Sequence, residues 1–517
     1  MGGRVVATVQ QNTLILVWLC VLPFFVAGCA ALFPRLSIRF HSEAERVAMA
    51  WAPFSLAALA CIMGVGLTAS LLPPALAGNP VIADYWWTQD LYHFRLQGDA
   101  LSLLAVFAVY ALGFPLHLHL VGLREAGPAA TDRGPIDHTG AHRAALILAA
   151  QGCAIAALLS ADLIVLVFSV QVALICLWGL VSITMPQRGL RFLLLAQVCG
   201  LLLLGGALLM WRQVGDTSIQ ALPLLLLSMN PSVLRLVSVL ILLGLLPLIS
   251  GAPAYGWLSS LLPLKRSIPM APATLLVIMG TALMLRLLPG VLLLPGLPTF
   301  AALCLVLGLF SLWWGGLRAW IATDMGAFAA WLTVAQSGYV LVALAAASSP
   351  NAPPAVLQAA AMQIFLAPLA ALTIWSVASY VATRTGSDAL PGISGMIKTM
   401  PLAGVALLAG GLSLAGVPPL AGFHVQRLLI GGLFADARPA LGVVVILADL
   451  LLVAAVLGVF RQAFLRGEPP PPAAPASPWL SGQLALLTVG IALIGLWPGP
   501  LIHWTEVIFR TALSVTP

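Results

Sequence analysis

Long apolar segments follow one another along almost the whole chain, separated by short polar turns. An apolar helix of about 20 residues crosses the hydrocarbon core of a bilayer and satisfies its own backbone hydrogen bonds there. About fourteen segments reach that length: 13–33, 47–72, 100–122, 143–161, 162–183, 190–211, 233–264, 268–289, 296–319, 325–347, 354–382, 397–434, 439–465 and 480–505. The pattern predicts an all-α integral membrane protein, with residues 1–517 forming a single membrane domain.

Two of these segments, the seventh and the twelfth, are too long for one straight crossing. The interruptions are Pro247 and Pro253 in the seventh segment, and Pro418, Pro419 and Gly422 in the twelfth. Broken helices at matching places in the two halves of a transporter-like chain indicate a binding or ion-transit site near mid-membrane. Proline is also tolerated in membrane helices for structural reasons alone, so the residues leave both interpretations open.

Composition agrees with a membrane protein. Hydrophobic residues make up 61% of the chain and charged residues only 8%, whereas a soluble domain carries about a quarter charged residues. The net charge of +7 comes from basic residues scattered through short loops, so we expect no nucleic-acid partner. Most of them flank one set of loops, and the positive-inside rule then predicts that these loops are cytoplasmic and that both termini lie outside. We expect the bacterial cytoplasmic membrane as the location.

Motifs for catalysis or cofactor binding are missing from the sequence. The seven cysteines stand singly, without a CxxC pair or a Cys/His cluster, so we expect no metal site. We also expect no cofactor and no catalytic residue. His117 and His119 lie near one end of the third segment, where we expect them at the membrane interface. Residues 467–478, with four consecutive prolines, predict a stiff extended linker.

Several fragments carry a family resemblance. They are residues 97–102, 162–178, 253–258, 336–339 and 395–423. In this order they resemble the antiporter-like membrane subunits of respiratory complex I (NADH:quinone oxidoreductase), and their relatives in multisubunit cation/proton antiporters and membrane-bound hydrogenases. The stretch LAGVPPLAGF within 395–423 is the most specific of them.

The resemblance implies a fold of about 14 transmembrane helices with two inverted five-helix repeats. These would be residues 143–289, covering spans 4–8, and residues 296–465, covering spans 9–13, with broken helices at spans 7 and 12. It also implies that the chain works in the lipid bilayer as one member of a hetero-oligomeric complex with other membrane subunits.

The family's proton path resembles a row of ionisable side chains at mid-membrane, and this chain departs from it. By local alignment those positions fall on Gln171, Leu248, Ile278, Gln363 and Gln426. A glutamine keeps hydrogen-bonding capacity but has no proton to give near neutral pH, and leucine and isoleucine cannot bind a proton. The central path is therefore predicted to be degenerate.

Few ionisable residues remain within the spans. His424 and Arg427 follow the break in the twelfth span, and Asp449 lies inside the thirteenth. Together they form a candidate residual polar path. An Arg427–Asp449 pair would neutralise both charges, and its role could be structural or in transport.

Three functions are compatible with these features. The first is a structural or coupling subunit of a complex I-like or related assembly, whose own central proton path is degenerate. The second is an active proton or cation translocator with a rerouted path through spans 12 and 13. The third is a membrane partner of a cytoplasmic inorganic-carbon uptake enzyme. The chain has no visible active site, although it could be a subunit of a redox-driven ion translocase.

Overall fold

The computed structural model describes residues 2–37, 43–88, 92–126, 138–183, 186–219, 221–222, 228–261, 267–288, 298–349, 351–472 and 477–513. Within these residues, 12 helices are long and apolar enough to cross a membrane, and two shorter apolar helices, Pro231–Leu245 and Pro401–Leu414, belong to the predicted broken spans. The prediction of an all-α integral membrane protein is confirmed, while the exact count of 14 spans stays a prediction.

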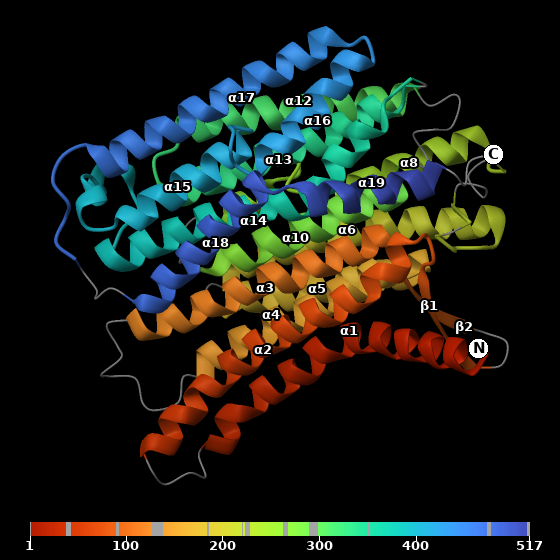
Figure 1. Cartoon of the computed structure of the whole chain (residues 1–517), viewed down its shortest axis with the longest axis horizontal. Helices are drawn as coiled ribbons and strands as arrows, with labels where there is room; N and C mark the ends of the chain where they lie inside the picture. Colours follow the sequence, from red (N-terminus) through yellow and green to blue (C-terminus); the bar gives the residue numbers. More distant parts are fainter. Residues whose placement is uncertain are drawn as a thin grey trace.

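The helices lie roughly side by side in one elongated bundle (Figure 1). The first half contains α1 (Gly2–Ser37), α2 (Glu43–Leu76), α3 (Ala100–Ala126), α4 (His138–Leu159), α5 (Leu163–Ser182), α6 (Pro186–Val214), α8 (Pro231–Leu245), α9 (Gly256–Leu261) and α10 (Ser267–Leu287). The second half contains α12 (Pro298–Trp320), α13 (Met325–Ala347), α14 (Pro354–Thr385), α15 (Pro401–Leu414), α16 (Gly422–Ala435), α17 (Pro439–Phe460), α18 (Pro478–Leu496) and α19 (Gly499–Leu513). Short 3₁₀ turns η1 (Leu390–Gly392) and η2 (Met396–Lys398) precede α15, and the π-helical turn η3 (Arg461–Leu465) extends α17.

The core of the bundle consists of helices that are buried on every side. The spans in α10 and α13 are buried over their whole apolar windows, and that in α14 almost so. By contrast, α1 and α17 lie at opposite edges in Figure 1 and expose large apolar side chains. The start of α1 and the end of α19 lie at the same end of the bundle.

A two-stranded hairpin between α2 and α3 was not predicted from the sequence. Strands β1 (Val81–Thr88) and β2 (Tyr92–Gly98) pair antiparallel, with Val81 opposite Gly98. The hairpin is too short for a span, and each strand can satisfy its backbone groups by pairing with the other. The all-α class therefore holds for the membrane-spanning part, with this hairpin as an addition.

The last predicted span, 480–505, is divided in the structure. Helix α18 ends at Leu496 and α19 begins at Gly499, with Pro498 between them, because proline cannot donate a backbone hydrogen bond to continue a helix. The predicted repeat boundaries at 289 and 296, residues 262–264 of the seventh span, and residues 473–476 of the predicted Pro-rich linker lie outside the described residues.

Candidate ion-path positions at the two helix breaks

The first break separates α8 from α9 and is closed by hydrogen bonds. The indole Nε1 of Trp257 donates to the carbonyl oxygen of Pro247 at 2.8 Å, and the amide of Ala252 donates to Ser311 Oγ of α12 at 2.9 Å. Pro253 follows Ala252 through a cis peptide bond. Trp257 and Ser311 thus hold the interrupted segment in one fixed conformation against its neighbours.

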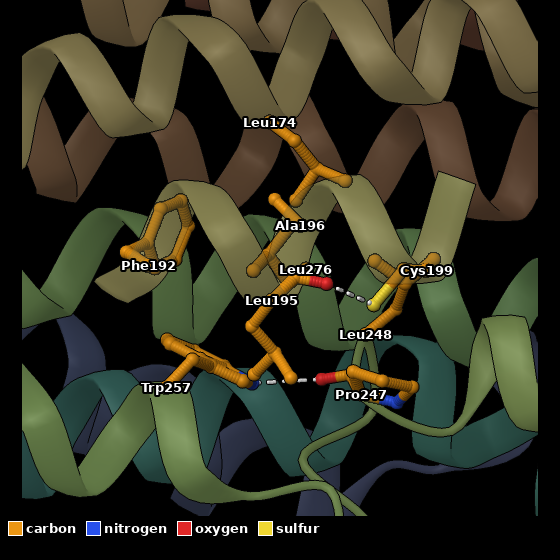
Figure 2. Close-up of a pocket in the computed structure, with 9 residues that line it drawn as sticks. All are labelled: Leu174, Phe192, Leu195, Ala196, Cys199, Pro247, Leu248, Trp257 and Leu276. Atoms are coloured by element: carbon orange, nitrogen blue, oxygen red, sulfur yellow. Dashed lines mark hydrogen bonds between the residues drawn. The ribbon is translucent and has the colours of Figure 1, made fainter. Parts of the chain in front are cut away.

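Leu248 lies in this break beside a small apolar cavity, which leaves about 10 Å³ for the centre of a water molecule. Figure 2 shows Phe192, Leu195 and Leu276 around the same space. On the other side, Leu248 packs so closely on α10 that a Cβ added to Gly280 would lie 2.7 Å from the Leu248 Cβ. A buried water needs two to four polar partners, which this lining does not offer. The lining around Leu248, which we predicted to align with an ionisable residue of the family, therefore offers no site for a bound water.

Ile278 and Gln171 complete the first half of the predicted row. Ile278 is fully buried on α10 and adds no polar atom. On α5, the Gln171 amide Nε2 donates to the carbonyl of Ala196 at 3.5 Å. A Cβ added to Gly200 would lie only 0.9 Å from that Nε2, so the side chain occupies the space that this glycine leaves open. Gln171 is the one polar side chain among these three positions.

The second break separates α15 from α16, and glycine is required within it. Gly416 has φ 70°, which favours glycine. The Gly422 amide donates to Ser413 Oγ at 3.0 Å, and a Cβ at Gly422 would lie 1.7 Å from the Ser413 carbonyl oxygen. Pro418 and Pro419 form the turn between these two glycines, joined by a cis peptide bond.

Helix α18 closes the second break from outside. A Cβ added to Gly495 would lie 2.0 Å from the carbonyl oxygen of Pro419, so the two backbones are in direct contact. His424 is buried, and its Nε2 lies 2.8 Å from the Gly495 carbonyl oxygen, to which it donates. Because a carbonyl can only accept, Nε2 carries a proton. His424 therefore joins α16 to α18.

Three glutamines gather beside the second break. Gln363 Nε2 of α14 lies 3.4 Å from Gln336 Oε1 of α13, and Gln336 Nε2 donates to the Leu414 carbonyl at 3.1 Å. With Gln426 and Ser413 they line a cavity that leaves about 10 Å³ for the centre of a water molecule, close to the minimum for one water. Gln336 was not predicted to be a site residue, although it lies in the fragment 336–339 that resembles the family.

Asp449 of α17 accepts a hydrogen bond at Oδ1 from the hydroxyl of Tyr339 on α13. The side chain of Gln426 lies beside the same hydroxyl. Arg427 is exposed and, among the described residues, forms no ion pair with Asp449. The structure thus links Gln426, Tyr339 and Asp449, and among the described residues it shows no hydrogen bond or ion pair that joins His424, Arg427 and Asp449 to one another.

The expectation that His117 and His119 are interfacial is wrong, because both are fully buried on α3. Ser376 donates to its own helix backbone and therefore accepts from Gln483 Nε2 at 2.8 Å. This turns Gln483 Oε1 toward His119 Nδ1 at 2.7 Å, while His119 Nε2 lies 2.8 Å from Ser379 Oγ. A neutral imidazole protonated at Nδ1 satisfies the whole network, which joins α3, α14 and α18.

Metal coordination has no evident place in this arrangement. In the part of the chain that the structure describes, no group of three or more His, Cys, Asp or Glu side chains lies close enough to hold a metal ion. The polar groups at the two breaks are amides, hydroxyls and backbone carbonyls. These can position water and hold helices together, and two ionisable side chains, His424 and Asp449, lie on the helices beside the second break.

Comparison with known proteins agrees with this architecture. Residues 160–452 match the family described as NADH:quinone oxidoreductase/Mrp antiporter, TM. The chain therefore belongs to this family of antiporter-like membrane proteins. The matched segment begins before α5 and ends within α17, so it contains both helix breaks.

Individual relatives show the same relationship over different lengths. NADH-quinone oxidoreductase subunit N of Desulforudis audaxviator is 25% identical over 509 residues, covering 92% of this chain and 94% of that protein. NADH-quinone oxidoreductase subunit N 2 of Opitutus terrae is 29% identical over 205 residues, covering 40% of this chain and 42% of that protein. The second match therefore spans less than half of the relative.

Solved structures share the fold. A chain of the Mrp complex from Dietzia sp. superposes with a TM-score of 0.81 at 18% identity, covering 98% of each chain. A chain of respiratory complex I from Thermus thermophilus with bound NADH gives a TM-score of 0.76 at 16% identity, covering 97% of this chain and 100% of that one. At these identities the likeness is one of fold.

Proposed function

We propose that this chain is an antiporter-like subunit of a multisubunit complex I-like or Mrp-like assembly in the bacterial cytoplasmic membrane, with both termini on the outer side. Its role is structural and coupling, and its own central row of residues carries no proton. The partners are other membrane subunits, which the names of its relatives and structural neighbours suggest. The basic residues around one set of loops support the orientation.

The dry packing of Leu248 carries this proposal. Proton transfer along a mid-membrane row needs groups that bind protons or water. Leu248 borders an apolar cavity and contacts α10, while Ile278 is fully buried. Gln171, Gln363 and Gln426 are amides, which do not titrate near neutral pH. The first half of the row is therefore interrupted by two apolar side chains, Leu248 and Ile278.

Two corresponding turns support the predicted inverted repeats, 143–289 and 296–465. Asp162 caps α5 and Asp324 caps α13, each accepting from backbone amides of the first helical turn. Each cap also lies in a short backbone bridge with a later loop, Asp162 with Ser218 and Asp324 with Ala389. These loops precede the two broken helices, so each half uses the same device before its break.

The test begins with purification of the native assembly through a tag on this chain and identification of its subunits by mass spectrometry. Proton movement is then measured in proteoliposomes for wild type, Gln363→Met and Gln426→Met. These variants conserve side-chain length while removing the amide. Proton stoichiometry that is unchanged in all three supports a structural and coupling role, whereas a chain that purifies without any partner subunit contradicts the proposal.

The Gln426–Tyr339–Asp449 contact supports a second candidate, a rerouted path through spans 12 and 13. It links the ionisable group Asp449 through Tyr339 to Gln426, which lines a cavity that has room for one water. Under this alternative, Gln426→Met lowers proton stoichiometry while the subunit composition stays intact.

The subunit composition also tests the third function, because a cytoplasmic inorganic-carbon uptake enzyme would co-purify in place of redox or antiporter subunits.

A further inference from the structure

One side of α17 faces away from the bundle and is apolar along its length. Its exposed side chains include Val443, Ile446, Leu447, Leu450 and Leu457, with Leu450 59% exposed. In Figure 1 this helix forms one edge of the molecule. Lipid or another apolar helix can cover such a face.

Asp449 lies at the edge of this apolar face. Its side chain is partly exposed, and it turns toward the bundle, where Oδ1 accepts from the hydroxyl of Tyr339. It lies about 15 Å along the helix from Pro439, at 1.5 Å per residue, which is near the middle of a hydrocarbon core about 30 Å thick. A carboxylate at this depth is costly unless it finds a partner, so the position requires an explanation beyond lipid solvation.

The described part of the chain supplies no counter-charge to Asp449. Its hydrogen-bond donor is the neutral hydroxyl of Tyr339, which binds Oδ1. Arg427 on α16 is exposed and does not pair with it. By contrast, the carboxylate in the turn between α16 and α17 has a counter-charge. Oδ2 of Asp436 lies 3.0 Å from Nε of Arg438 and forms an ion pair with it. The carboxylate of Asp449 is therefore held by one hydrogen bond from Tyr339, and no positive charge of the described residues pairs with it.

We propose that the outer face of α17 docks a transmembrane helix of a neighbouring subunit that carries a lysine or arginine opposite Asp449. The apolar side chains of the face match an apolar helix, and a cation supplies both charge and N–H donors to the carboxylate. This inference rests on the proposed membership of a multisubunit assembly.

Site-specific photo-crosslinking tests the docking surface. A photoreactive amino acid replaces Leu450 in the tagged full-length chain, and the crosslinked product is identified by mass spectrometry in native membranes. The expected product is one neighbouring membrane subunit, joined within one helical turn of a lysine or arginine. Three outcomes would overturn the inference: crosslinks to lipid alone, crosslinks to a second copy of this chain, and crosslinks to a helix that has no basic residue within that turn.

Two matched variants isolate the charge. Asp449→Asn keeps the shape and the contact with Tyr339, and it lowers the crosslinking yield about tenfold, as expected when a buried charge pair loses one member. Tyr339→Phe removes the internal hydrogen bond while leaving the carboxylate, and the yield is retained. Thermal unfolding of each purified variant confirms that the chain itself is folded. An unchanged yield in Asp449→Asn contradicts the inference.

The same samples separate this inference from the proposed function. If other membrane subunits co-purify while position 450 crosslinks only to lipid, the proposed docking surface on α17 is wrong. The proposed membership of a multisubunit assembly is then still supported. If no subunit co-purifies, both fail. A charge swap completes the test, because Asp449→Lys should lose the crosslink and a matching acidic substitution at the partner's basic residue should restore it.

Discussion

Gly422 contacts Ser413 so closely that its amide donates to the serine hydroxyl at 3.0 Å while a Cβ on Gly422 would lie 1.7 Å from the serine carbonyl. This contact joins the two halves of the broken twelfth span. Helix α16 can therefore begin at this place only if position 422 has no side chain.

Gly422→Ala is therefore expected to destabilise the chain. The added methyl meets backbone, which cannot move aside, so the free energy of unfolding should fall by about 1–3 kcal/mol or more. Thermal unfolding of the purified protein in detergent measures the effect. Gly431→Ala on the same helix is the control, because nothing lies within 4 Å of its added Cβ. Equal stability of the two variants would contradict the conclusion that position 422 must lack a side chain.

Gly200 and Gln171 should be energetically coupled. The Cβ of Gly200→Ala would lie 0.9 Å from Gln171 Nε2, so the glutamine must move and lose its contact with Ala196. In a Gln171→Ala background the same substitution should cost less. A double-mutant cycle on thermal stability is expected to give a coupling of about 0.5–3 kcal/mol. Additive effects would show that the two residues do not share this space.

Leu248→Lys should be strongly destabilising. The new ammonium would enter an apolar cavity without a polar partner, and a lysine at a helix centre costs about 3 kcal/mol for membrane insertion. Leu248→Met is the matched control, because it conserves volume and polarity class. We expect the lysine variant to show reduced recovery from membranes and a lower unfolding temperature. Normal recovery and stability of Leu248→Lys would mean that the cavity hydrates, which would weaken the proposed function.

His119→Phe should weaken the contact between α3, α14 and α18. The ring volume is kept, but Gln483 Oε1 loses its donor and Ser379 its acceptor. Each buried polar atom left unsatisfied costs about 1–3 kcal/mol. His503→Phe on α19 is the control, because the side chain of His503 is exposed. Unfolding in increasing denaturing detergent measures both, and a His119 variant as stable as the control would show that the network is not needed.

The sequence by itself determined the membrane class, the order of the helices and the places where two of them break. These features are local, because the length of an apolar run sets a span and proline and glycine interrupt a helix wherever they occur. The side-chain identities also determined that Leu248 and Ile278 cannot titrate. None of these conclusions depends on which helix lies beside which.

Tertiary structure decided the partners. The sequence suggested that Asp449 pairs with Arg427, since the two lie on consecutive helices. In the structure Asp449 instead accepts a hydrogen bond from Tyr339, which is 110 positions away. It buries His119 against Gln483, although a position near a span end suggested the interface. Side-chain partners across helices depend on the rotation and packing of each helix, and apolar segments with little amphipathic pattern carry almost no sequence signal for that rotation. The hairpin between α2 and α3 escaped prediction because pairing between two short strands depends on their neighbours.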